Sequence, residues 1–110
     1  MSVSVIIPAL NEEGTVADVV RACLADNPLE VLVIDADSSD ATASRAAAAG
    51  ADVHNWRDIL PVEPRPGKGE SLWRGVAAAK GDIVVFVDAD LESAAPGMVA
   101  ALAAPFSDPA

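Results

Sequence analysis

A chain of 110 residues is long enough for one domain with a single hydrophobic core. Its hydrophobic fraction of 52% and charged fraction of 22% exclude the composition of a disordered chain. The net charge of −10 argues against sequence-independent nucleic-acid binding, which needs clustered Lys and Arg. No stretch approaches the roughly 20 apolar residues of a membrane span, and no secretion signal is recognisable at the amino terminus. The sequence therefore predicts a cytoplasmic protein with neither a nucleic-acid nor a membrane partner.

Short apolar runs alternate with segments of helical spacing along the whole chain. In chain order, these predict strand 3–7, helix 16–24, strand 31–34, helix 41–49, strand 51–54, helix 70–80, strand 83–87 and helix 96–104. We expect Pro8 to end the first strand, because proline cannot donate to the ladder. Residues 105–110 are expected to fray. This alternation predicts an α/β fold with a mostly parallel sheet flanked by helices and joined by right-handed crossovers.

A long loop is expected at residues 55–69, because its prolines and the glycines at 67 and 69 are unsuited to helix or strand interiors. A loop of this length in a compact domain is more often functional or mobile than a simple connection between elements. Lys68 stands between the two glycines, which allow an anion to approach the backbone closely. The following helix would add its amino-terminal dipole to the charge of Lys68. The segment is nevertheless not a P-loop, and no G-x-G-x-x-G fingerprint is present either.

Ligands bind parallel sheets outside the carboxyl ends of the strands, near the point where the strand order reverses. Three polar segments follow predicted strands, at residues 8–12, 35–40 and 88–90. The third follows an apolar run that is typical of a strand buried on both faces. Asp88 and Asp90 point to one side if that strand continues through Ala89. Two adjacent carboxylates repel each other, so the pair suits a hard divalent cation, Mg²⁺ or Mn²⁺, that itself carries phosphate oxygens.

Several single residues favour structural roles. Cys23 has no partner for a disulfide and predicts an inert buried thiol. His54, the only histidine, is expected to be a structural or surface residue rather than a ligand. Trp56 and Trp73 are expected to pack the long loop and its helix onto the sheet.

Taken together, these residues resemble family 2 glycosyltransferases of the GT-A fold. The resemblance covers essentially the whole chain and is specific in four segments: VIIPALNEE at 5–13, VID with SSD at 33–40, RPGKGESLW at 65–73 and VDADL at 87–91. It implies a Rossmann-like GT-A nucleotide-sugar-binding half. The segment 65–73, together with 8–12 and 88–91, narrows the resemblance to one group of family members. Those members transfer glucose from UDP-glucose, in some cases GDP-glucose, to 3-phosphoglycerate with retention of configuration.

The resemblance also implies roles for individual residues. Those that would bind the nucleotide sugar are Pro8, Ala9, Leu10, Asn11, Glu12, Ala36, Ser38, Lys68, Asp88, Ala89 and Asp90. Asp88 and Asp90 would be the catalytic D-x-D pair, with Asp90 the better direct ligand of Mg²⁺ or Mn²⁺, which would stabilise the departing diphosphate. Relatives place Gly before the Ser of the second segment, often after an Asp or Ser. Here Ala36 offers the base only backbone groups, and Asp37 replaces the Gly.

Family members continue well beyond 110 residues, and the remainder carries the acceptor site and a metal-binding His that His54 does not match. We therefore expect residues 1–110 to be one truncated GT-A nucleotide-binding domain with little or no transferase activity alone. Its partners would be the nucleotide sugar, a phosphorylated small-molecule acceptor, and a second copy or a complementing carboxyl-terminal half. One alternative is a non-catalytic nucleotide- or metal-binding module. The other is a phospho-accepting signalling domain, which would need an acid pair after the first strand and a Lys after a late strand. Here PALN at 8–11 follows the first strand, and Lys68 lies in a loop before a helix, so this alternative is disfavoured.

Overall fold

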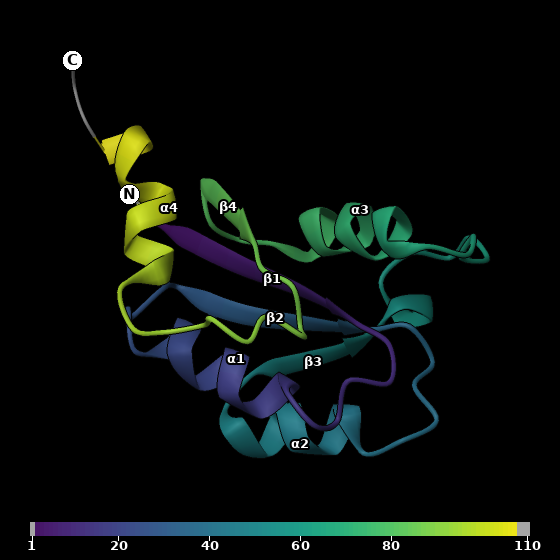
Figure 1. The fold of residues 1–110 in the computed structure, drawn as a ribbon. Helices are drawn as coiled ribbons and strands as arrows, with labels where there is room; N and C mark the ends of the chain where they lie inside the picture. Colours follow the sequence, from purple (N-terminus) through teal and green to yellow (C-terminus); the bar gives the residue numbers. More distant parts are fainter. Residues whose placement is uncertain (1, 108–110) are drawn as a thin grey trace.

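Four parallel strands form the centre of the computed structural model, which describes residues 2–107, the side chains of 106 and 107 excepted (Figure 1). The strands are β1 (Val3–Ala9), β2 (Glu30–Asp35), β3 (Asp52–Asn55) and β4 (Ile83–Phe86). They lie in the order β3-β2-β1-β4, and every neighbouring pair is parallel. The predicted α/β fold with a parallel sheet is therefore confirmed. Strand order reverses between β1 and β4, so the switch point lies at their carboxyl ends.

Helices cover both faces of this sheet (Figure 1). They are α1 (Val16–Leu24), α2 (Thr42–Ala49), α3 (Lys68–Ala78) and α4 (Met98–Ser107), with a short 3-10 helix, η1 (Trp56–Asp58), after β3. Helices α1, α2 and α4 bury one core against the sheet, and α3 with η1 buries a second, smaller core on the opposite face. Among the described helices, none is long and apolar enough to cross a membrane.

Pro8 does not end β1, which continues to Ala9 and pairs Pro8 with Ile34. Along a strand, the backbone groups of successive residues point to opposite neighbours, so Pro8 faces the same side as Ile6. The Ile6 carbonyl accepts from Val87 N–H at 3.0 Å on the β4 side, and the Ala9 carbonyl accepts from the β2 side. The Pro8 nitrogen, which carries no hydrogen to donate, therefore faces β4. The pairing of β1 with β4 has already ended at Ile6, so no ladder hydrogen bond is lost. The expectation at Pro8 was wrong because it ignored this direction.

Strand β4 is buried on one face only, contrary to the sequence prediction. Ile83 and Val85 are buried, whereas Val84 is half-buried and Phe86 is 49% exposed. The reason is that β4 lies at the edge of the sheet, and α3 crosses β1 and β2 instead of covering it.

Helix α3 begins at Lys68, two residues earlier than expected, and ends at Ala78. Gly67 stands outside it with φ 121°, a conformation that favours glycine, but Gly69 lies inside the first turn. The predicted loop is interrupted by η1 as well. At the other end of the chain, α4 runs through Pro105 to Ser107, so fraying from 105 onward is wrong for the first three of those residues. Residues 108–110 lie outside the described part.

Candidate nucleotide-binding site

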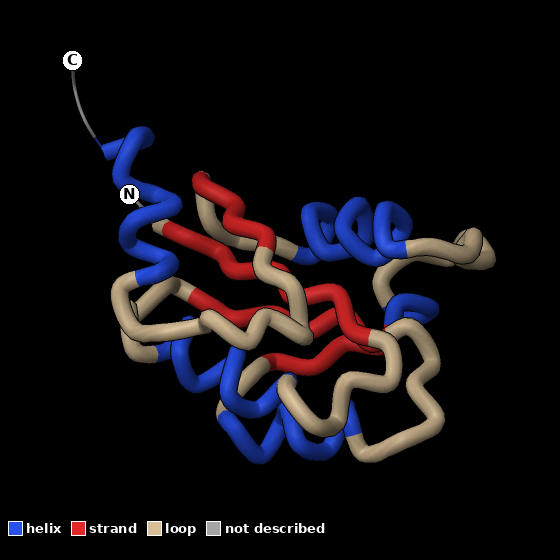
Figure 2. Tube along the Cα trace, viewed as in Figure 1, coloured by secondary structure: helices blue, strands red, loops and turns tan. Residues whose placement is uncertain are grey.

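The turns that follow β1 and β2 are joined by hydrogen bonds at the carboxyl edge of the sheet, where Figure 2 shows the loops gathered. Asn11, with φ 55°, donates its N–H to Ser38 Oγ at 2.9 Å, and its Oδ1 accepts from Ser39 N–H at 2.8 Å. Glu12 N–H donates to Thr42 Oγ1 at 2.7 Å. Two of the three predicted segments therefore lie side by side. Asn11 and Ser38 hold the turns together and do not line the cavity between them and α3.

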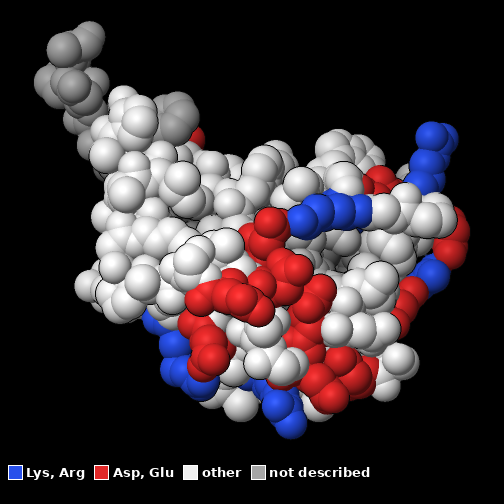
Figure 3. Space-filling model, viewed as in Figure 1, with Lys and Arg blue, Asp and Glu red and all other residues white. Residues whose placement is uncertain are grey.

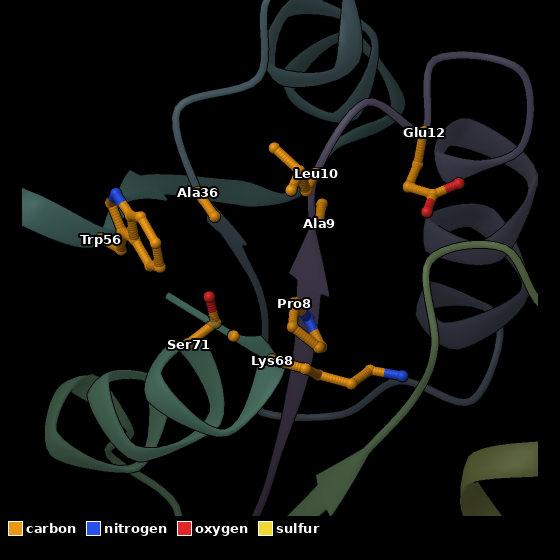
Figure 4. Close-up of a pocket in the computed structure, with 9 residues that line it drawn as sticks. Pro8, Ala9, Leu10, Glu12, Ala36, Trp56, Lys68 and Ser71 are labelled. Atoms are coloured by element: carbon orange, nitrogen blue, oxygen red, sulfur yellow. The ribbon is translucent and has the colours of Figure 1, made fainter. Parts of the chain in front are cut away.

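A cavity of about 210 Å³ opens at this edge, between the ends of β1 and β2 and the first turns of α3. Figure 4 shows the residues that line it, which are Pro8, Ala9, Leu10, Glu12, Ala36, Trp56, Gly67, Lys68 and Ser71. Pockets for drug-sized ligands typically occupy about 300–1,000 Å³. The cavity therefore matches part of a nucleotide in size and is too small for a complete sugar nucleotide.

The predicted acidic pair follows β4 in a turn rather than in a continued strand. Leu91 N–H closes this turn by donating to the Asp88 carbonyl at 3.3 Å. Burial still alternates, so Ala89 is buried while Asp88 and Asp90 are both exposed. Thr15, at the start of α1, donates its hydroxyl to the Ala89 carbonyl at 2.7 Å and anchors the turn beside the other two segments. The condition that the strand continue through Ala89 fails, but both carboxylates nonetheless face solvent.

Lys68 connects the cavity to the acidic turn. It lines the cavity through its stem, and its ammonium donates to Asp88 Oδ1 in an ion pair of two half-exposed side chains. This hydrogen bond, opposed by desolvation and supported by the charges of Asp88, Asp90 and Glu12, raises the pKa of Lys68. In Figure 4 the Lys68 ammonium extends across the cavity from α3, away from Trp56.

Negative charge is concentrated on this edge, where Figure 3 shows a group of Asp and Glu side chains with few cations among them. Burial raises the pKa of Glu12, and the charges of Asp90 and Asp40 raise it further. An anionic ligand would meet this same field. Its approach therefore requires either Lys68 or a bound cation.

Asp88 and Asp90 supply the carboxylate oxygens that Mg²⁺ and Mn²⁺ prefer. Within residues 2–107, however, no group of three or more His, Cys, Asp or Glu side chains is arranged to hold a metal ion. One of the two carboxylates is also engaged by Lys68. The pair fits a divalent cation as part of a coordination shell, which the oxygens of a diphosphate would complete.

Asp37, which the resemblance matches to a glycine of the family pattern, adopts a left-handed conformation with φ 61°. Its carboxylate accepts from Asn55 Nδ2 at 3.0 Å and from Arg57 Nε at 2.8 Å, and these hydrogen bonds lower its pKa. Arg57 thereby balances the added charge, and the turn after β2 is attached to the end of β3 and to η1. Ala36, beside it, does line the cavity.

Gly67, which the sequence predicted would let an anion approach, lines the cavity, but the sequence did not identify Ser71 and assigned Trp56 only to packing. Trp56 does pack on the sheet, against Ile6 and Ile34, but it also lines the cavity. Trp73 is 56% exposed, so its expected packing was wrong. Arg74 of α3, whose side chain is completely buried, was not identified either, and its i, i+4 spacing from Glu70 was the one available signal.

The two other residues considered individually lie away from the cavity. Cys23 is buried in the larger core, as expected, and burial, with the nearby charge of Asp26, raises the pKa of its thiol to about 11. His54 is half-buried on β3 in register with Ile34 and does not line the cavity.

Comparisons with known proteins match nearly the whole chain. A model of glycosyl transferase family 2 matches residues 4–110. The glucosyl-3-phosphoglycerate synthase of Mycolicibacterium paratuberculosis is 48% identical over 108 residues, covering 94% of this chain and 33% of that protein. The Petrotoga mobilis protein of the same name is 41% identical over 113 residues, covering 93% and 35%. A solved glucosyl-3-phosphoglycerate synthase from Mycobacterium tuberculosis, in complex with Mn²⁺, UDP-glucose and phosphoglyceric acid, has a TM-score of 0.89 at 47% identity, covering 96% of this chain and 39% of that one. The chain thus spans about a third of the length of these curated relatives.

Proposed function

The chain belongs to glycosyl transferase family 2, and from this premise we propose that it is the donor-binding half of a metal-dependent glucosyltransferase. The donor is UDP-glucose, with GDP-glucose as the alternative, and the acceptor is 3-phosphoglycerate, glucosylated with retention of configuration. The names of the relatives and the ligands of the Mycobacterium tuberculosis structure support these substrates.

The observation that carries the proposal is the connection between the cavity and the acidic turn. Pro8, Ala36 and their neighbours form a pocket of nucleoside size, and Lys68 extends from its wall to Asp88. A sugar nucleotide with its nucleoside in the cavity would place its diphosphate beside Lys68 and the D-x-D turn. No other group of residues at this edge combines an apolar recess with a lysine and two exposed carboxylates in the described part of the chain.

Charge determines what each side chain contributes. Asp90, with Asp88, would hold Mg²⁺ or Mn²⁺, and the bound cation would act as a Lewis acid at the leaving diphosphate. Lys68 would neutralise one further charge of the diphosphate. Glu12, Asn11 and Ser38 would keep the first two turns in register around the nucleoside, through the hydrogen bonds described above. Since the edge is strongly acidic and Lys68 already pairs with Asp88, Lys68 alone would not suffice, and we expect nucleotide binding to require the cation.

We propose further that residues 1–110 form a single nucleotide-binding domain and that the acceptor site lies in a part not represented here. A complementing carboxyl-terminal half, or a second copy, would complete the enzyme, and the assembled protein would act in the cytoplasm. The incomplete ligand set at Asp88 and Asp90 is the observation that favours the alternative, a non-catalytic nucleotide- or metal-binding module.

Calorimetric titration with UDP in the presence of Mn²⁺, Mg²⁺ or EDTA tests the proposal. We expect binding with either metal, none with EDTA, and none by Asp90→Asn. Asp18→Asn is the matched control, because Asp18 is 81% exposed on α1 and pairs only with Arg21 among the described residues. A folded wild-type chain that fails to bind UDP with metal would contradict the proposal. Turnover of UDP-glucose with 3-phosphoglycerate by the 110-residue chain would contradict its division into halves, and competition by GDP distinguishes the two donors.

A further inference from the structure

We propose that Arg74 is a positioning residue for the nucleoside end of the cavity and acts through Trp56. The inference rests on the proposed function for the identity of the ligand. Arg74 does not line the cavity, and it belongs to none of the motifs from which the sequence predicted the site.

Arg74 lies in α3 with its side chain completely buried. Its guanidinium donates to three backbone carbonyls of one segment, from Nη1 to Trp56 O at 2.8 Å and Leu60 O at 3.2 Å, and from Nη2 to Val62 O at 2.5 Å. Glu70 Oε1 accepts from Nε and Nη2 at 3.4 Å. Burying a charge is costly unless it is paired and hydrogen-bonded, and here every bond but those to Glu70 goes to the segment 56–62.

The segment that Arg74 gathers has few other anchors. It contains the single turn of η1 followed by a run of irregular residues. Arg57 forms ion pairs with Asp37 and Glu63, but these side chains are between 40% and 76% exposed, and exposed ion pairs contribute little. The buried fork of Arg74 is therefore the main polar attachment of this segment to the helix that carries Lys68.

The two ends of the cavity differ in chemistry (Figure 4). Lys68 extends its ammonium toward the side of Glu12, where a diphosphate would lie, whereas Trp56, Ala36 and Ser71 line the opposite side. Trp56 is 9% exposed, and its indole nitrogen is buried without a well-formed hydrogen bond, although the Asp37 carboxylate lies near it. The strongest polar anchor of Trp56 is thus its carbonyl, which Arg74 holds.

Ala36 cannot read a base with its side chain, and among the residues that line the cavity Trp56 is the one aromatic side chain that could contact a base. An aromatic contact to a base contributes about fivefold or more to affinity. Displacing Trp56 should therefore weaken a nucleoside diphosphate and leave pyrophosphate, which occupies only the Lys68 end, unaffected. A residue that merely supports the fold would weaken both ligands together.

The experiment uses Arg74→Lys in a Trp73→Phe background, where Trp56 is the only tryptophan. Lysine keeps the charge, but a single ammonium cannot reproduce the planar fork to three carbonyls. We expect the emission of Trp56 to shift to the red, UDP affinity with Mn²⁺ to fall at least about fivefold, and pyrophosphate affinity to stay within about twofold. Trp56→Leu should give the same loss, with little further loss in the double variant. Arg21→Lys, an exposed arginine on α1, is the matched control.

Unchanged emission and UDP affinity in Arg74→Lys would overturn the inference, and so would equal losses of UDP and pyrophosphate. Should that variant not fold, Glu70→Gln removes the carboxylate partner while leaving the guanidinium, and must show the same ligand-selective loss in smaller degree. If the Trp73→Phe chain itself binds neither ligand, the proposed function fails instead. The emission of Trp56 in the unliganded Arg74→Lys chain then still decides whether Arg74 positions it.

Discussion

Gly75 allows α3 to lie directly on the sheet, and its replacement by alanine provides a sharp test of this packing. A Cβ at this position would clash with Ile6 Cγ2 at a distance well under 3.0 Å. It would also lie 3.1 Å from Ile6 Cδ1 and 3.3 Å from Ile34 Cγ1. Both isoleucines are completely buried. Ile6 is β-branched and cannot rotate its methyl away without leaving its rotamer. The helix would have to move away from β1 instead.

Two opposing effects set the size of the change. Alanine in place of glycine favours a helix interior by about 1 kcal/mol. Overpacking a well-packed core costs about 1–3 kcal/mol, and the severity of this contact places Gly75→Ala near the upper end. The net expectation is a loss of about 1–2 kcal/mol in the free energy of unfolding. For a domain of about this length, the midpoint of thermal unfolding should fall by roughly 4–10 °C.

Urea unfolding of wild type, Gly75→Ala and Gly69→Ala measures this difference. Gly69 lies in the same helix, its φ is not positive, and nothing lies within 4 Å of a Cβ placed there. Gly69→Ala should therefore be as stable as the wild type or more so. Because α3 carries Lys68 and Ser71 into the cavity, Gly75→Ala should also weaken UDP binding. If Gly75→Ala matched Gly69→Ala in stability, the close packing of α3 on β1 would be refuted.

Three further predictions concern single side chains. Lys68→Gln should weaken UDP binding about tenfold or more through the loss of a charged contact, while Mn²⁺ alone binds at least as well to the freed Asp88, both measured by calorimetry. Burial raises the pKa of Asp26, but hydrogen bonds from the N–H groups of Ala100, Gly97 and Val99 outweigh burial and lower this pKa below its ordinary value of 3.8. The ionised carboxylate therefore stabilises the fold above pH 3.8, and this stabilisation is lost as the pH falls through the lowered pKa. Asp26→Ala should accordingly unfold more readily than the wild type at pH 7 and lose less stability on acidification. Cys23, with a pKa of about 11, should react with a thiol reagent only on unfolding, and rapid labelling of the native chain would contradict its burial.

Local pattern in the sequence was sufficient for the order and type of the main elements. Every predicted strand and helix is present, the sheet is parallel, and the segments 8–12, 35–40 and 88–90 do meet at one edge. These features follow from apolar periodicity and from the crossover rule, which act along the chain and need no knowledge of neighbours. Three of the four segments that resemble the family lie where a strand passes into a turn at this edge, and the fourth, residues 65–73, joins the long loop to the first turns of α3.

What the pattern could not supply was the identity of each neighbour. Pro8 is accommodated because β4 has already ended beside it, and Phe86 is exposed because α3 lies over other strands. Arg74 is an ordinary helix residue in the sequence, and only folding brings it to the carbonyls of a segment 12 to 18 residues away. The sequence by itself determined the elements, the sheet and the acidic edge, because each depends on local preference. Only the tertiary structure decided which side chains form the cavity wall, because burial and hydrogen bonding at that wall depend on segments distant in the chain.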